Sequence, residues 1–84
     1  MNKALTISPA DLRNAILHII GEYQMQHGYS PSRREIAQAL SLSTTPIQEN
    51  ILILVDEGYL THVPGLSRTL RLTEKGVVGY VSHE

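Results

Sequence analysis

Apolar side chains recur three and four positions apart along three stretches of the chain, 8–26, 32–40 and 43–57. That spacing places them on one face of a helix and leaves polar residues on the opposite face. The three stretches therefore predict three amphipathic helices. The residues that would form their apolar faces are Leu12, Ala15, Ile16, Ile19, Ile20, Tyr23, Ile36, Ala37, Leu40, Ile47, Ile51 and Leu54.

The predicted helices carry start and stop signals. Ser8 followed by Pro9 is typical of an N-cap and a first helical residue. Ser32 stands three residues before Glu35, which is the spacing of a capping box, where each side chain bonds to the other residue's backbone amide. Gly58 can adopt the left-handed conformation that often ends a helix. These signals agree with the bounds that the apolar spacing predicts.

Two short alternating segments follow the third predicted helix. Residues 59–63 and 68–72 are rich in strand-forming residues, and Pro64-Gly65 between them indicates a turn. We expect the segments to pair as a hairpin across the loop 64–67. Three helices followed by a hairpin predict a mainly α fold with a small β hairpin. This is a winged helix-turn-helix, in which a three-helix bundle carries a two-stranded wing.

The chain is short enough for one domain. Its 84 residues fit a single domain, 1–84, with a core at about 8–73. The remaining residues, 74–84, are expected to be a C-terminal extension beyond the minimal fold. Within that extension, 77–81 is apolar and rich in residues that favour strands.

The second helix of a helix-turn-helix enters the DNA major groove, and its N-terminal residues reach base edges. Glutamine can bond to adenine, glutamate can accept from cytosine, and threonine offers a hydroxyl and a methyl group. The alternative interpretation is a polar helix end that only faces water. The candidate base-reading residues are Ser43, Thr44, Thr45, Gln48 and Glu49.

Basic residues are few but unevenly placed. The formal net charge of −1 argues against a protein that coats nucleic acid by charge alone. Arg33 and Arg34, at the start of the second predicted helix, are candidate phosphate ligands, or else an exposed pair offset by Glu35. Arg68 in the predicted wing is a candidate for a narrow minor groove, or else a solvated charge. Arg71 completes the candidate DNA-binding set.

The residue types argue against an enzyme, a cofactor and a membrane protein. The chain has no Cys, and its four His show no metal-ligand spacing. No pair of carboxylates is placed for acid–base catalysis, and no segment approaches the roughly 20 apolar residues of a membrane span. We therefore expect a protein that is not an enzyme, binds no cofactor or metal, and works in the cytoplasm of a bacterium or of a phage host.

One stretch resembles the DNA-binding domain of LexA-type SOS repressors: GYSPSRREIAQALSLS, then a helix ending in EGYL, then Ser-Arg before an alternating strand. The resemblance covers about 12–72, and its most specific part is 31–42. It implies a winged helix that binds double-stranded DNA. The family's base-reading positions correspond here to Ser43, Thr45, Pro46, Gln48 and Glu49, and its wing arginine corresponds to Arg68.

The chain also departs from that family. Thr45-Pro46 differs from the usual sequence, which leaves the operator open. Asp56-Glu57 stand where basic residues are common in the family. The family's self-cleaving C-terminal domain, with its catalytic serine–lysine pair and main dimer interface, does not follow in this chain. Autoproteolysis is therefore not expected here.

Extra apolar residues indicate a second interface, because contiguous exposed apolar surface usually marks one. We hypothesise that the chain forms a homodimer through the end of the third helix and the C-terminal segment. The alternative is that this segment packs on its own bundle. The residues concerned are Leu52, Ile53, Val55, Val77, Val78, Tyr80 and Val81.

These observations predict a sequence-specific, double-stranded DNA-binding regulator of transcription, a small bacterial or phage repressor. The rival interpretation is a winged helix that binds a protein partner, such as an anti-repressor or a partner of a replication or transcription factor. The net acidity and the extra aliphatic residues would suit that rival.

Overall fold

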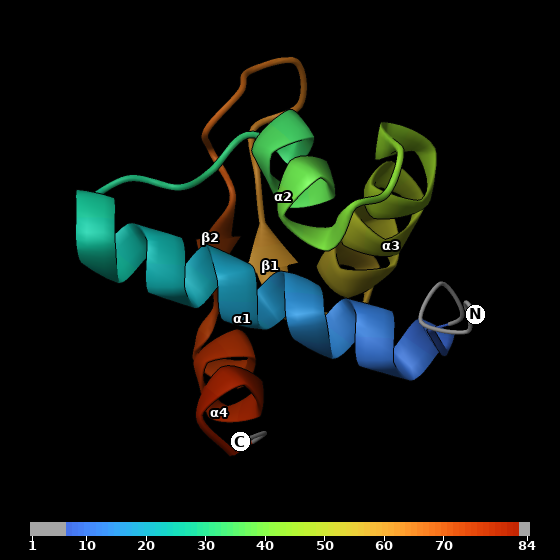
Figure 1. The fold of residues 1–84 in the computed structure, drawn as a ribbon. Coiled ribbons are helices and arrows are strands. Elements are labelled where there is room, and N and C mark those ends of the chain that lie inside the picture. The colour runs from blue at the N-terminus through green and yellow to red at the C-terminus, as the bar shows by residue number, and fades with distance from the viewer. Residues whose placement is uncertain (1–6, 83–84) are drawn as a thin grey trace.

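The computed structural model describes residues 7–82 (Figure 1). In that part, the chain forms three helices, a two-stranded sheet and a further helix. The elements are α1 (Pro9–His27), α2 (Arg33–Leu40), α3 (Thr44–Asp56), β1 (Leu60–Thr61), β2 (Arg71–Leu72) and α4 (Glu74–Ser82). The predicted winged helix-turn-helix is confirmed.

The first two helices begin where local side-chain chemistry predicts. The Ser8 hydroxyl accepts from the Asp11 amide at 3.1 Å. At α2, the Ser32 hydroxyl accepts from the Glu35 amide at 3.1 Å, and Glu35 Oε1 accepts from the Ser32 amide at 2.9 Å. This complete capping box satisfies two amides that have no partner inside the helix. It fixes the first turn of α2, which carries Arg33 and Arg34.

The sheet is much shorter than the predicted strands 59–63 and 68–72. Only two antiparallel pairs form, Leu60 with Leu72 and Thr61 with Arg71. Beyond them, the Val63 amide donates to the Thr69 hydroxyl at 2.9 Å and not to a backbone carbonyl. A side chain thus replaces the next rung of the ladder. The predicted strand bounds are wrong, and 62–70 is a loop that projects from a minimal sheet.

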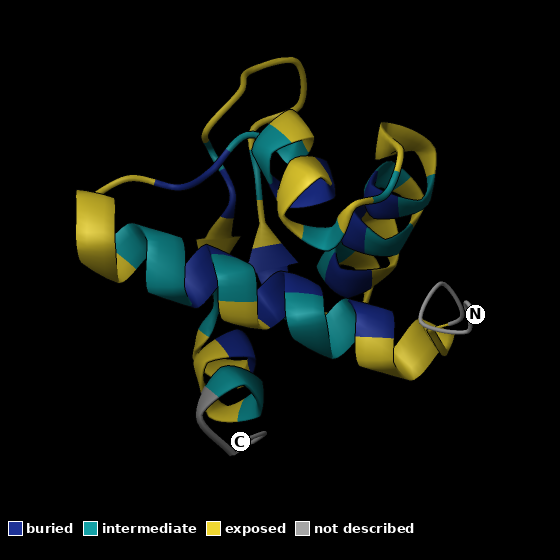
Figure 2. Ribbon diagram, in the orientation of Figure 1, coloured by how far each residue is buried: buried dark blue, intermediate teal, exposed yellow. Residues whose placement is uncertain are grey.

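The core lies where α1, α2, α3 and the hairpin meet (Figure 2). It contains the predicted apolar faces except for Ala15 and Tyr23, which are half-buried outside it. It adds Leu17 of α1, which lies outside the predicted face of that helix. The buried apolar residues are Leu12, Ile16, Leu17, Ile20, Ile36, Ala37, Ile47, Ile51, Leu54, Leu60 and Leu70. No helix of the described part is long and apolar enough to cross a membrane.

The C-terminal segment forms a helix although its valines favour strands. The Thr73 hydroxyl accepts from the Gly76 amide at 3.0 Å, which caps α4, and Glu74 in the first turn suits the positive end of the helix. The apolar and β-prone composition of 77–81 is therefore overridden by a good cap and by packing.

α4 packs against the side of α1 opposite α2 (Figure 1). The Tyr80 ring lies on Gly21, and its hydroxyl donates to Glu22 Oε2. Leu17 lies under the same helix, close to Gly79. This contact explains why Leu17 is buried, and it shows that the extension packs on its own bundle.

The α4–hairpin contact leaves no space for a side chain at Gly76. A methyl group there would lie 2.1 Å from the Tyr59 carbonyl oxygen, which accepts from the Thr73 amide. We expect Gly76→Ala to lower the free energy of unfolding by about 1–3 kcal/mol, because backbone must move to admit the methyl group. Urea denaturation followed by circular dichroism measures the change.

Gly79→Ala is the matched control in the same helix. A methyl group there meets its nearest neighbour, the Tyr59 ring, at 3.6 Å, which is an ordinary contact. Alanine should therefore leave stability unchanged or raise it by up to about 1 kcal/mol through helix propensity. Equal stability of the two variants would contradict the close approach at Gly76.

Candidate nucleic-acid interface

The amino-terminal end of α3 presents polar side chains to solvent. Ser43, Thr44, Thr45 and Glu49 are exposed, and Gln48 is half-buried. A shallow hollow of about 420 Å³ is lined by Arg33, Thr44, Thr45, Gln48 and Glu49. The structure thus brings the predicted base-reading residues together, beside one of the predicted phosphate ligands.

The opposite face of α3 seats the helix. Ile47 and Ile51 are fully buried and Leu54 is 2% exposed. Each such side chain contributes roughly 1.5–3 kcal/mol by its burial. Asn50 fixes the orientation of α3 relative to α1, because it donates to the Pro46 carbonyl at 2.8 Å and accepts from Arg13 of α1 at 3.2 Å. The polar end of α3 therefore projects from a firmly held helix.

Arg33 lies between α2, α3 and the wing. Its Nη2 donates to Nδ1 of His62 at 3.0 Å. Its Nε is buried and has no hydrogen-bond partner among the described residues. Burial lowers the pKa of Arg33, but an arginine remains protonated at neutral pH. A cation is thus held at the edge of the hollow that the reading residues line. The hydrogen bond between His62 and Arg33 joins residues 29 positions apart, so the spacing of the sequence could not predict it.

Arg34 is exposed on the first turn of α2 and has no side-chain partner within the described residues. An unpaired cation is repelled by the positive end of its own helix, and a bound anion would relieve that repulsion. Its position is consistent with the predicted phosphate contact.

Arg68 is exposed, but its guanidinium lies against other residues of the chain. Its Nη2 donates to Glu35 Oε2 at 2.8 Å, and its Nη1 donates to the Tyr23 hydroxyl and the Ser30 carbonyl, both at 3.3 Å. Its guanidinium also lies over the Tyr29 ring, 5.3 Å from the ring centre. The structure therefore ties this predicted groove residue to α1, to the α1–α2 loop and to α2. The tyrosines lie about forty positions away in sequence, so spacing could not reveal the contact.

Arg71 lies away from the reading end of α3. It is exposed on β2 and lines a different hollow, with Gly21, Gln24 and Met25 of α1 and Val77 of α4. The structure does not bring Arg71 together with the other candidate DNA-binding residues.

The predicted dimer surface is divided. Leu52 is exposed beside the wing, where it lines a hollow of about 550 Å³ with Gln48, His62 and Leu66. Val55 packs against the core. Val77 and Val78 are exposed on α4, and the side chain of Val81 lies outside the described residues. Leu52 and the α4 valines thus face different parts of the surface.

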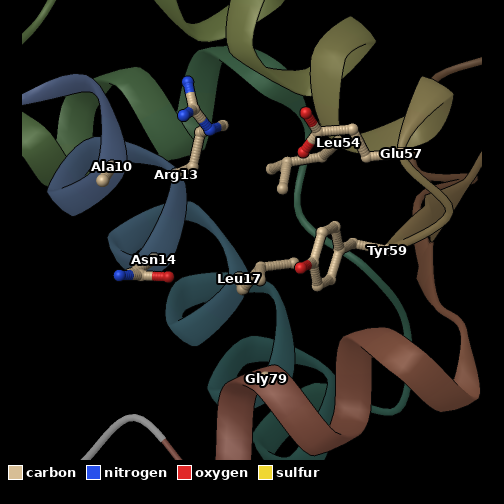
Figure 3. A pocket seen from close by; sticks show the side chains of 8 residues that line it. All are labelled: Ala10, Arg13, Asn14, Leu17, Leu54, Glu57, Tyr59 and Gly79. Atoms are coloured by element: carbon tan, nitrogen blue, oxygen red, sulfur yellow. The ribbon is translucent and has the colours of Figure 1, made fainter.

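A fourth hollow, of about 310 Å³, lies between α1, α3 and α4 (Figure 3). Figure 3 shows the Tyr59 ring projecting toward Leu17, with Arg13 and Glu57 at the rim. None of the candidate DNA-binding residues lines it. No group of three His, Asp or Glu side chains within the described residues is placed to hold a metal ion.

Comparison with known proteins gives one family. Residues 8–69 match the family model described as LexA DNA binding domain. The chain is 38% identical over 64 residues to a LexA repressor of Limosilactobacillus reuteri, a match that covers 75% of this chain and 31% of the relative. It is 40% identical over 60 residues to a LexA repressor of Cellvibrio japonicus, covering 70% and 30%. The chain thus spans about three-tenths of the length of these relatives.

Glu35 makes the stability of the fold depend on pH. Hydrogen bonds from the Arg68 guanidinium and the Ser32 amide lower the pKa of Glu35 from 4.5 to about 2. The unfolded chain therefore binds this proton at a higher pH than the folded chain does. The stabilisation by ionised Glu35 should be fully present above about pH 4.5 and should disappear as the pH falls through about 2.

We expect Glu35→Gln to be less stable than the wild type near pH 6, with the difference shrinking steadily between about pH 4.5 and pH 2. Urea unfolding at a series of pH values measures this difference. Arg34→Gln, which alters the neighbouring cation outside the ion pair, should keep the wild-type dependence. If the stability difference between Glu35→Gln and the wild type is the same at every pH, ionised Glu35 is not the source of the pH dependence.

Proposed function

Because the chain belongs to the LexA DNA-binding domain family, we propose that it is a sequence-specific repressor that binds operator DNA in a bacterium or a phage-infected cell. The family is a DNA-binding domain and not an enzyme. The observation that carries the proposal is the exposed polar end of α3 beside Arg33, with Arg34 exposed next to Arg33 on the first turn of α2. We place its action in the cytoplasm, where bacterial DNA lies.

In this proposal α3 enters the major groove with its amino-terminal end. Gln48 and Glu49 line the hollow beside Arg33, and Thr44 and Thr45 line it one helical turn earlier. Gln48 can make two bonds to adenine, and Glu49 can accept from the amino group of cytosine. Ser43 caps α3 without a side-chain hydrogen bond to the helix, so its hydroxyl is free to contact the DNA backbone.

Arg33 and Arg34 would bind phosphates beside the groove. Arg34 is exposed, and Arg33 is held in place by His62. These contacts would supply affinity and register, whereas the α3 side chains would supply sequence choice. Salt should weaken such binding, because each neutralised phosphate releases counterions.

The rival function, docking on a protein, has less support. Its acidic feature, Asp56 and Glu57, lies at the carboxyl end of α3. At a rise of 1.5 Å per residue, Asp56 lies about 10 Å along the helix from Glu49 and about 18 Å from Thr44. The acidic residues therefore do not surround the candidate reading surface, which is bordered by Arg33.

We also propose that two copies act together on a two-fold symmetric operator, as helix-turn-helix proteins commonly do. Val77 and Val78 on the outer side of α4 are the candidate contact, with exposed fractions of 44% and 63%. We leave Leu52 and Val55 out of this contact, because one lies beside the wing and the other packs against the core.

Selection of bound duplexes from a random pool tests the proposed function. We expect one motif to be enriched at physiological salt. Gln48→Ala should then relax the choice at a single base pair, where it costs about 1–3 kcal/mol of discrimination. Competition between single-base variants of the motif, measured by fluorescence anisotropy, detects the change.

Arg34→Ala, on the first turn of α2, is the matched control. It should weaken binding to all sequences alike and reduce the slope of log K against log salt by about 0.9. If no duplex is bound even at low salt, the proposed function fails. If Gln48→Ala weakens every sequence equally, Gln48 is not a reader.

Sedimentation velocity tests the proposed homodimer. We expect the wild type to associate at micromolar concentration or on a two-fold symmetric duplex, and Val78→Lys to abolish that association, because a buried charge would be left without a partner. Leu52→Lys, on the other exposed apolar site, should leave association unchanged. A wild type that stays monomeric under both conditions would exclude this interface.

A further inference from the structure

The wing has too little sheet to hold its own direction. Only two residue pairs join β1 to β2, and the loop 62–70 extends beyond them. A two-stranded sheet of this length has little independent stability. The position of the loop over the rest of the molecule must therefore depend on side-chain contacts.

Two such contacts fasten the loop to the first turn of α2. Near one end of the loop, His62 accepts from Arg33 at 3.0 Å. Near the other end, Arg68 donates to Glu35 at 2.8 Å. The segment 62–68 is thus a strap held at both ends by the same helical turn, and Figure 1 shows the loop arching beside the start of α2.

The contacts of Arg68 leave it poorly suited to a phosphate. Both terminal nitrogens already donate to partners in the chain: Glu35, Tyr23 and Ser30. The Glu35 carboxylate lies against the same guanidinium, so it cancels the charge locally and would repel a phosphate. This cluster holds the wing against the rest of the chain. Because the Arg68 charge is neutralised by Glu35, the cluster is not suited to bind an anion.

The backbone supports the same conclusion. Arg68 has a φ of +60°, one of two positive values among the described non-glycine residues. A residue other than glycine rarely adopts that backbone conformation, and the conformation persists only where the surrounding structure stabilises it. The ion pair, the carbonyl of buried Ser30 and the Tyr29 ring supply that hold.

We propose that Arg68 is a positioning residue for DNA binding: paired with Glu35, it fixes the wing against α2 and does not itself contact DNA. Glu35 thereby has a second role besides capping α2. The proposal rests on the proposed function, because it concerns how the wing is presented to a duplex. It predicts that removing an acidic residue weakens the binding of a polyanion, which is opposite to the effect expected from charge alone.

The affinity test compares Glu35→Gln, Arg68→Gln and the double variant on the selected duplex, at several salt concentrations. Gln at position 35 can still complete the capping box, so this change removes the ion pair and spares the cap. We expect each single variant to bind about fivefold to tenfold more weakly than the wild type. The double variant should be no weaker than either, and the salt slope should stay at the wild-type value.

Arg68→Lys separates charge from geometry. A lysine keeps the positive charge but cannot donate to three partners in the fixed fork of an arginine. We expect it to bind as weakly as Arg68→Gln. Wild-type affinity for Arg68→Lys, tighter binding by Glu35→Gln, or a salt slope reduced by about 0.9 in Arg68→Gln would each overturn the proposal, because each indicates a direct phosphate contact.

Amide hydrogen exchange tests the fastening without DNA. The Leu66 amide donates to the Val63 carbonyl at 3.1 Å inside the strap. We expect its exchange to speed up in Glu35→Gln and Arg68→Gln, while buried amides of α1 keep wild-type rates. If exchange at Leu66 is unchanged, the Arg68–Glu35 pair does not hold the wing in place, even if DNA binding is weaker. Absence of any selected duplex for the wild type would instead defeat the proposed function, and the exchange result would still decide the fastening.

Discussion

The carboxylate of Glu35 joins local and distant parts of the molecule. One oxygen accepts from the Ser32 amide and completes the cap of α2, and the other accepts from Arg68, 33 positions later in the chain. Through Arg68 it also reaches the loop between α1 and α2 at Ser30. A single half-buried side chain thus defines where α2 begins and where the wing lies beside it. The surface that we propose to bind DNA is built around this turn.

A second constraint is the seat of α3. Its buried stripe orients the helix, and Asn50 links its first turn to α1 through Arg13. Rigid support matters for a reading helix, because a base edge discriminates only when donors and acceptors lie at hydrogen-bond distance. The core and the proposed interface are therefore two faces of one helix. Substitutions on the buried face should change stability, and substitutions on the polar face should change sequence choice.

The C-terminal helix extends the three-helix design by covering a second side of α1. Tyr80 lies on Gly21, where a larger residue would collide with the ring, and Gly76 lies against the backbone at Tyr59. These glycines let α4 approach both α1 and the hairpin closely. Val77 and Val78 of α4 remain exposed, and α4 as a whole lies on the side of α1 away from α3 (Figure 1). In the proposed complex, a second copy bound at α4 would leave the amino-terminal end of α3 uncovered for DNA.

The sequence by itself determined the first three helices, the caps of α1 and α2, and the polar amino-terminal end of α3. Those features depend on residues three or four positions apart, such as Ser32 with Glu35 or Ile47 with Ile51, and local spacing records them directly. The fold class followed from the order of these elements, and the family from one motif.

Only the tertiary structure decided what the distant partners do. The position of the Arg68 guanidinium requires Tyr23, Tyr29 and Ser30, which no spacing rule connects with it. The burial of Leu17 requires α4, whose valines favour strands until a cap and a neighbouring helix overrule them. The short sheet likewise arises because the Thr69 side chain takes the place of a backbone partner. In each case a long-range contact outweighs the local preference, because burial and charge pairing act between residues that only the fold brings together.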